Sequence, residues 1–225
     1  MPDDTSEQIA SSENRRRVLL KDKAYEEIKQ GILDGRFAPG TFLAERWLAD
    51  TLEMSKTPVR AAIGRLEAEG FLSVSPQQGI VVRSLSFEEI IDHYDMRIAL
   101  ESFVARRLSG RLTVEQEASL REEIEAQRAV AAASDVAAYV VRDAGFHVLL
   151  CKFARNQEIV RVMERQYDKL NRIIHRVMDE DPSRMASSTE EHEAILDAIA
   201  EGKGDQAAEN MAAHMEYGKR HLISL

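Results

Sequence analysis

The stretch from Ala38 to Val82, APGTFLAERWLADTLEMSKTPVRAAIGRLEAEGFLSVSPQQGIVV, decides the fold of the N-terminal part of this chain. Two apolar helical patterns follow one another in it, one around residues 43–52 and one from Thr57 to Leu66. Thr57 before Pro58 is typical of a helix start, because the hydroxyl caps the helix and the missing proline N–H costs nothing there. Residues 71–82 predict two short strands around a Pro-Gln-Gln-Gly turn. This order predicts a winged helix-turn-helix, and DNA is therefore the first partner to consider.

The start of the second helix of this motif carries candidate DNA contacts. Lys56, Thr57 and Arg60 face outward if the apolar stripe of the helix faces the core. The start of this helix enters the major groove in helix-turn-helix proteins, so these side chains are predicted to meet phosphates and base edges. Gln77 and Gly79, in the turn of the wing, are expected to lie against a neighbouring groove. For any one of the charged residues alone, the alternative is a solvated helix charge.

Charge is distributed unevenly along the 225 residues, whose net charge is −9. Residues 15–83 hold 12 Lys and Arg against 9 Asp and Glu, a net of +3, whereas residues 84–225 hold 18 against 26, a net of −8. A monomer with so few positive groups would bind DNA weakly, so a homodimer that reads two half-sites is expected. We predict a disordered arm over residues 1–15, a DNA-binding domain over 16–84 and a helical effector-binding and dimerisation domain over 85–225.

Composition also bears on where the protein acts. The single cysteine, Cys151, excludes an internal disulfide and fits a reducing compartment. No apolar run approaches the roughly 18 residues of a membrane span, and we identify no targeting signal. We therefore expect a cytoplasmic protein with no membrane partner.

Beyond Ser84 the sequence predicts helices only. Three pairs match capping boxes: Ser86 with Glu89, Thr113 with Gln116, and Ser188 with Glu191. Six or so helices are expected between about 87 and 223, forming an antiparallel bundle. The predicted fold class is mainly α, with an N-terminal winged helix-turn-helix and a C-terminal all-α antiparallel helical bundle.

A group of metal-ligand residue types lies within the predicted bundle. Asp143 and His147 are four residues apart, so they share one face of a helix. His192 and His214 each lie 11 residues from Lys203, the centre of a glycine turn. Equal distances from the turn of an antiparallel hairpin place the two imidazoles at the same height, provided that both face inward. One carboxylate and three imidazoles suit zinc, nickel, manganese or iron, although a single helical histidine is more often structural.

The runs PGTFLAERWLA (39–49) and SKTPVRAAIGRLEAEGFL (55–72) resemble the GntR family of bacterial transcription factors. The resemblance implies that arginines on the first helix and on the recognition helix contact operator DNA, at Arg46 and Arg60 here. Lys56 stands where the family usually has arginine, and Ala61 where glutamate is common. These departures leave the operator sequence open.

The runs RDAGFHVLLCKFARN (142–156) and EEHEAILDAIAEGKGDQAAENMAAH (190–214) resemble the C-terminal effector (FCD) domain of the FadR-like branch, in its shorter VanR-type variant. The resemblance implies a divalent transition metal with open positions for a small carboxylic acid, held by Asp143, His147, His192 and His214. Zinc is the favoured metal, with nickel, manganese and iron as alternatives. DMRIALESF (95–103) resembles the first effector-domain helix, where Arg97 matches an arginine that faces the pocket.

Two effector-binding residues are predicted, Arg97 and Asn171. The alternative for Arg97 is a salt bridge to Glu101 on the next turn. Together these features predict a ligand-responsive transcriptional regulator and not an enzyme. The resemblance implies that binding of the organic acid releases DNA, so a repressor is expected.

Two other functions compete with this prediction. A helical metalloenzyme acting on a carboxylate would need a general base that is not itself a ligand, and Glu191 and Glu193 are expected to point to other faces as solvated surface. A purely structural metal would have a closed coordination sphere.

Overall fold

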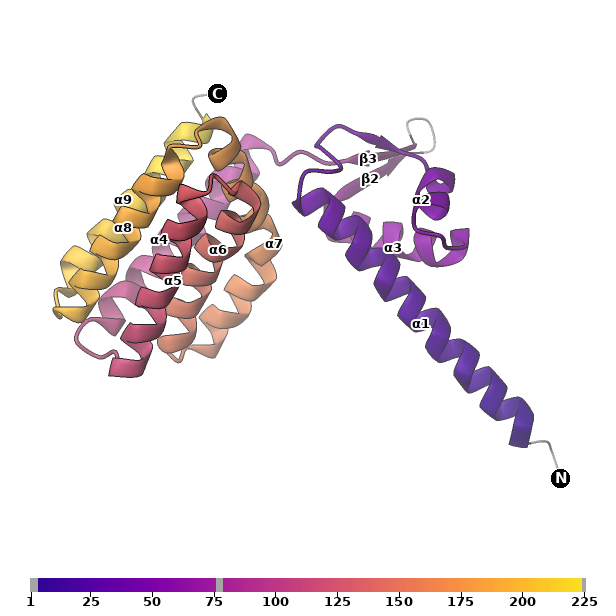
Figure 1. The fold of residues 1–225 in the computed structure, drawn as a ribbon, viewed down its shortest axis with the longest axis horizontal. Coiled ribbons are helices and arrows are strands. Elements are labelled where there is room, and N and C mark those ends of the chain that lie inside the picture. The colour runs from indigo at the N-terminus through magenta and orange to yellow at the C-terminus, as the bar shows by residue number, and fades with distance from the viewer. Residues whose placement is uncertain (1–3, 76–78, 224–225) are drawn as a thin grey trace. The chain divides into compact units, whose positions relative to one another are not determined.

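Helices make up most of the computed structural model, which describes residues 4–75 and 79–223 (Figure 1). The chain divides into two units, residues 1–84 and residues 85–225. No helix in these described ranges is long and apolar enough to cross a membrane.

The first unit is a winged helix-turn-helix, as predicted from the sequence. Its elements are α1 (Asp4–Leu33), β1 (Phe42–Leu43), α2 (Glu45–Thr51), α3 (Lys56–Ala68), β2 (Leu72–Ser75) and β3 (Gly79–Val82). The antiparallel sheet has the order β1-β3-β2, with Val74 opposite Ile80 in the wing. The core is formed by apolar residues from α1, α2, α3 and the sheet, among them Ile28, Leu48, Val59, Leu66 and Leu72.

Two helix starts in this unit differ from the prediction. Helix α3 begins at Lys56 with Ser55 as its N-cap, so Thr57 is not the cap. Pro58 is accommodated two residues further in, because the first N–H groups of a helix have no intrahelical partner. Helix α1 begins at Asp4, where a disordered arm over 1–15 was expected. Residues 5–20 contain no glycine or proline and several strong helix formers, so nothing local ends the helix there.

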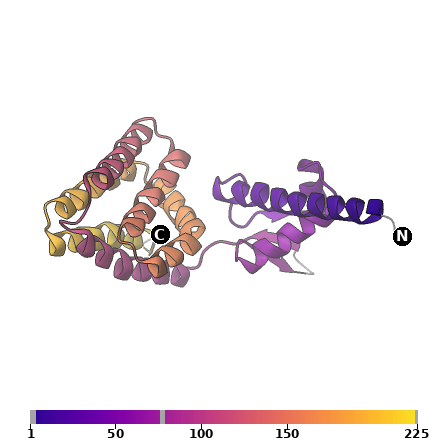
Figure 2. The same ribbon diagram turned by 90° about the horizontal axis from the view of Figure 1, so that it is seen from below.

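The second unit is the predicted antiparallel bundle (Figures 1 and 2). Its helices are α4 (Phe87–Leu108), α5 (Val114–Ala132), α6 (Val136–Phe153), α7 (Gln157–Glu180), α8 (Arg184–Ala200) and α9 (Gly204–Ile223). Helix α4 packs most extensively on α9, and α6 lies between α5 and α7. This packing buries an apolar core that includes Phe146, Leu150, Ile195 and Met211.

Capping explains most helix boundaries of the bundle and one error in their prediction. Ser86 with Glu89 and Thr113 with Gln116 form complete capping boxes at the starts of α4 and α5. Ser188 and Glu191 do not form one, because α8 already begins at Arg184, just after Pro182. Both residues lie within α8, where Ser188 donates a hydrogen bond to Asp143 and Glu191 pairs with Arg184.

Candidate metal centre and DNA-binding residues

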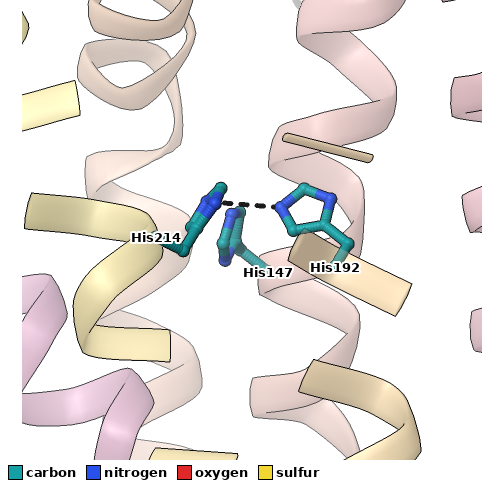
Figure 3. A group of neighbouring side chains, drawn as sticks. All are labelled: His147, His192 and His214. Atoms are coloured by element: carbon teal, nitrogen blue, oxygen red, sulfur yellow. Dashed lines mark hydrogen bonds between the residues drawn. The ribbon is translucent and has the colours of Figure 1, made fainter. Parts of the chain in front are cut away.

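Three imidazoles from different helices meet inside the bundle: His147 of α6, His192 of α8 and His214 of α9 (Figure 3). One ligand atom from each lies within 4.8 Å of the others. The Nε2 atoms of His192 and His214 are 3.3 Å apart. The equal spacing from the turn at residues 202–204 therefore places these two side chains at one height, as predicted.

Asp143, the fourth predicted ligand, lies on the same face of α6 as His147, although the three histidines alone form the tightest group. Its Oδ2 lies 3.7 Å from Nε2 of His147, and its Oδ1 lies 3.8 Å from Nε2 of His192. The hydroxyl of Ser188 donates to Oδ1 over 3.2 Å, which orients the carboxylate. All four side chains are buried or nearly so.

Each histidine binds a polar partner through its other ring nitrogen. Nδ1 of His147 lies 2.6 Å from Glu101, Nδ1 of His192 lies 2.7 Å from Gln127, and Nδ1 of His214 lies 2.7 Å from Glu191. Because these partners offer oxygen acceptors, Nδ1 carries the proton in each neutral ring and Nε2 keeps its lone pair. Such partners also fix the orientation of metal-binding imidazoles.

The surroundings keep two of these imidazoles neutral and two carboxylates ionised. Burial lowers the pKa of His192 well below its usual value, and neighbouring His214 lowers it further. Burial also lowers the pKa of His214, although its bond to Glu191 opposes this. Burial alone would raise the pKa values of Glu101 and Glu191, but Arg97 and His147 beside the first, and His214 and Arg184 beside the second, lower both to about 2.

The donor set fits a divalent transition metal. Two nitrogens that each lie about 2.0–2.1 Å from a tetrahedral zinc ion are separated by about 3.4 Å, close to the distance between His192 and His214. Nε2 of His147 is buried and has no hydrogen-bond partner in the described chain. A buried acceptor without a partner is costly, and a bound cation would satisfy it.

A small pocket that opens to solvent adjoins this group of side chains. Asp143 and His214 line one part of it, together with Arg97 and Arg184. The apolar part of the lining is Ile174, Val177, Met178 and Met215. The pocket therefore brings charged and apolar side chains to one opening beside the imidazoles.

Of the two residues predicted to bind an effector, one lines the pocket and the other is not among the described pocket residues. Arg97 lines the pocket and also makes the salt bridge to Glu101, with Nε 2.7 Å from Oε1, so both interpretations of this residue hold. Asn171 is buried on α7 but is not among the described pocket residues. Its amide bonds to Tyr167, which lowers the pKa of a phenol that burial raises.

Four residues of the site were missed or misjudged in the sequence: Glu101, Gln127, Arg184 and Glu191. Glu191 was expected on the solvated surface, yet it bridges Arg184 and His214. Its position seven residues after Arg184, on the same helix face, was a usable signal. No such signal in the sequence pointed to Gln127, because its contact with His192 joins residues 65 positions apart.

The predicted DNA contacts lie on the exposed side of the helix-turn-helix. Lys56 and Thr57 are exposed at the start of α3, and Arg46 is exposed on α2. Arg60 is also exposed but forms a bidentate ion pair with Glu45, at 2.8 and 2.9 Å. Gly79 opens β3 with a positive φ of 75°, a conformation that favours glycine. Gln77 lies outside the described residues.

A winged helix-turn-helix and a helical bundle in one chain define a class of DNA-binding transcriptional regulators. Residues 20–82 match the family described as bacterial regulatory proteins, gntR family, and residues 92–217 match the FCD domain. The chain belongs to the GntR family of transcriptional regulators, with an FCD domain at its C-terminal side. It is a regulator and not an enzyme.

Similar proteins agree with this assignment. The chain is 35% identical over 130 residues to an HTH-type transcriptional regulator in the TAR-I ttuE-ttuC' intergenic region of Agrobacterium vitis, covering 56% of this chain and 76% of that protein. It is 26% identical to the HTH-type transcriptional repressor RspR of Escherichia coli, covering 88% and 86%. A crystal structure of a GntR regulator from Rhodococcus has a TM-score of 0.77 at 21% identity, covering 91% and 97%, and shows the same fold.

Proposed function

We propose that this GntR-family regulator is a homodimeric repressor that releases its operator when a small carboxylic acid binds in the bundle. The observation that carries the proposal is the pocket beside three converging imidazoles, because it offers a ligand access to the metal site. Similarity to the repressor RspR supports the direction of the response. Such a regulator acts in the cytoplasm, where the bacterial chromosome lies.

The proposed metal is a divalent transition ion, with zinc favoured over nickel, manganese and iron. Asp143, His147, His192 and His214 would hold it, and as a Lewis acid it would attract a carboxylate. Glu101, Gln127 and Glu191 keep the three imidazoles in the tautomer that a metal needs. Arg97 also lines this pocket, and its Nη2 is buried and without a partner in the described chain. Asn171 is not among the described pocket residues, so we propose no direct contact between it and the effector.

The proposed DNA contacts are Arg46, Lys56, Thr57 and Arg60, with Gln77 and Gly79 in the wing. Arg60 would have to leave or share Glu45 to reach a base, because the ion pair occupies two of its donors. Each subunit of the homodimer would read one half-site.

The pocket distinguishes this proposal from a purely structural metal, which would need no ligand-accessible space beside it. Thermal melting of the metal-loaded chain against a panel of small organic acids tests the difference, with chelated protein alongside. We expect one class of acid to raise the melting temperature, and chelation or His147→Ala or His214→Ala to abolish the effect. A melting temperature that chelation lowers but no acid raises would establish the structural role instead.

DNA binding is tested on duplexes selected from a random pool by the wild-type protein. Arg60→Ala is expected to weaken selected sites by about 5- to 150-fold, the range for loss of a base contact worth about 1–3 kcal/mol. Lys56→Ala should weaken all sequences alike and reduce the salt slope by about 1. Arg111→Ala, an exposed change in the other unit, is the control. If the acid tightens rather than weakens binding of the wild type, the protein is not a repressor relieved by ligand.

A further inference from the structure

The charged groups around the pocket are already paired within the protein. Among the described residues that line it, the charged side chains are Arg97, Arg184 and Asp143, beside the imidazole of His214. Arg97 is 2% exposed and Arg184 is 3% exposed, so water screens neither charge well. What each arginine can offer a ligand therefore depends on the partner that it already has.

Both arginines have a carboxylate of their own. Arg97 donates to Glu101, and Arg184 donates through both of its terminal nitrogens to Glu191, with Nη1 2.6 Å from Oε1. The Arg184 guanidinium also stacks on Tyr217, with its carbon 4.0 Å from the ring centroid, which holds it in place. Because each carboxylate is paired with a guanidinium, which is always charged, both are counted as ionised.

The net charge beside the pocket follows from the charged side chains just described. Two arginines stand against three carboxylates, those of Glu101, Glu191 and the metal ligand Asp143, which leaves one negative charge in excess. Imidazoles that bind a metal are neutral and add no charge, and a divalent ion reverses the sign to one positive charge in excess. A single negative charge on the ligand then balances the site.

Building on the proposed function, we infer that the effector is a small monocarboxylate with an apolar tail, not a di- or tricarboxylate. Its carboxylate would meet the metal and the guanidinium of Arg97, whose Nη2 has no partner in the described chain. Its tail would face Ile174, Val177 and the two methionines of the lining. A second carboxylate would meet the apolar side chains of the lining, which leaves its charge unpaired, or would have to displace Glu191, which accepts two hydrogen bonds from Arg184.

Isothermal titration of the full, zinc-loaded chain with acids of similar size tests the inference. Isobutyrate and malonate are of similar size, but malonate carries a second carboxylate where isobutyrate carries methyl groups, and isobutyramide has the shape of isobutyrate without the charge. We expect isobutyrate to bind at least about tenfold more tightly than malonate, because an unpaired buried charge is strongly unfavourable, and isobutyramide to bind weakly. If malonate binds as tightly as isobutyrate, the inference is overturned and the protein is a regulator that responds to acids in general. If isobutyramide binds as tightly as isobutyrate, the inference is also overturned, because the carboxylate is then not what the site recognises. If protein whose zinc loading has been confirmed binds no acid of a wider panel, the proposed function itself fails.

A charge variant tests the same inference from the protein side. Glu191→Gln keeps the size of the side chain and releases the positive charge of Arg184, so the ratio of malonate to isobutyrate affinity should rise at least about fivefold. Glu193→Gln is the matched control on the same helix, because Glu193 pairs with Arg128 at the surface. The ratio is compared at confirmed zinc loading, since Glu191 also contacts His214. An unchanged ratio in Glu191→Gln would show that charge balance does not select the effector.

Discussion

At the scale of single residues, the site depends on groups that never touch the proposed metal. Gln127 is completely buried, accepts a hydrogen bond from His192 and donates to the backbone carbonyl of Arg142. An amide in this position fixes one tautomer of the imidazole without adding a charge. Glu101 and Glu191 do the same for the other two histidines but also neutralise arginines. One set of side chains thus sets both the ligand tautomers and the charge of the pocket.

Gln127→Met should weaken zinc binding by about 10- to 100-fold, because Nδ1–H of His192 would lose its acceptor and the ring its orientation. Competition with a chromophoric chelator measures the change. Gln206→Met, an exposed substitution on α9, should leave zinc affinity unaltered. Equal affinities in the two variants would mean that packing against Phe146, which stacks on His192 at 4.3 Å between centroids, orients the ring by itself.

His93 gives the bundle a sensitivity to acid that is separate from the metal ligands. It is 3% exposed, and neither ring nitrogen has a hydrogen-bond partner in the described chain. Burial lowers its pKa to about 3, and the charges of Arg97 and Lys169 contribute, while Glu101 opposes. The unfolded chain takes up this proton below about pH 6.5 and the folded chain does not, so stability falls as the pH falls through this window.

Between pH 7 and pH 5 this histidine should cost the chelated protein about 2 kcal/mol of unfolding free energy. His93→Leu should therefore flatten the pH dependence by about that amount in urea titrations. His175→Leu is the control, because His175 is partly exposed and pairs with Asp179. Identical slopes in wild type and His93→Leu would show that His93 is protonated in the folded protein.

At the scale of elements, the contact of α4 with α9 depends on a glycine. A Cβ on Gly218 would overlap the hydroxyl oxygen of Tyr94, and both residues line the pocket. Gly218→Ala should destabilise the bundle by about 1–3 kcal/mol, as overpacked cores do. Tyr94→Phe should recover part of this loss, because the nearest ring atom would then be Cζ at 3.0 Å.

Gly64→Ala is the matched substitution, in α3, where a Cβ would meet no atom within 4 Å. It should stabilise the protein by about 0.5–1 kcal/mol, since alanine is the better helix former. Chemical denaturation of the single variants and of the Tyr94→Phe, Gly218→Ala double variant measures all these effects. Destabilisation that Tyr94→Phe does not relieve at all would place the clash elsewhere.

The helices also show which features can be predicted from the sequence and which cannot. Periodicity and caps such as Ser86 predicted the bundle helices, because these signals lie within a few residues of each other. The spacing of His192 and His214 from one turn predicted their encounter for the same reason. The partners Glu101 and Gln127 join helices across 46 and 65 positions, which no local pattern encodes. Glu191 was misjudged because Ser188 and Glu191 match a capping box in the sequence, although α8 already begins at Arg184.

At the scale of the whole molecule, the two units carry different reporters of unfolding. Trp47 is the single tryptophan of the chain and belongs to α2 of the first unit. All four proposed metal ligands belong to the second unit, residues 85–225. Metal binding stabilises a folded unit by mass action, about 2.7–4.1 kcal/mol at 100 to 1,000 times its dissociation constant.

Saturating zinc should therefore raise the melting transition seen by helical circular dichroism by about 5–15 °C, the shift expected for that free energy in a domain of this size. The transition seen by Trp47 fluorescence should move by far less, because its unit contributes no ligand. His214→Ala separates specific loading from general effects of the ion, since it should abolish the shift. If the tryptophan and dichroism transitions rise together with zinc in the wild type, the two units unfold as one cooperative body. The free energy of metal binding would then reach the DNA-binding unit directly, and an effector acting at the metal would change operator affinity through the stability of that unit as well as its arrangement in a dimer.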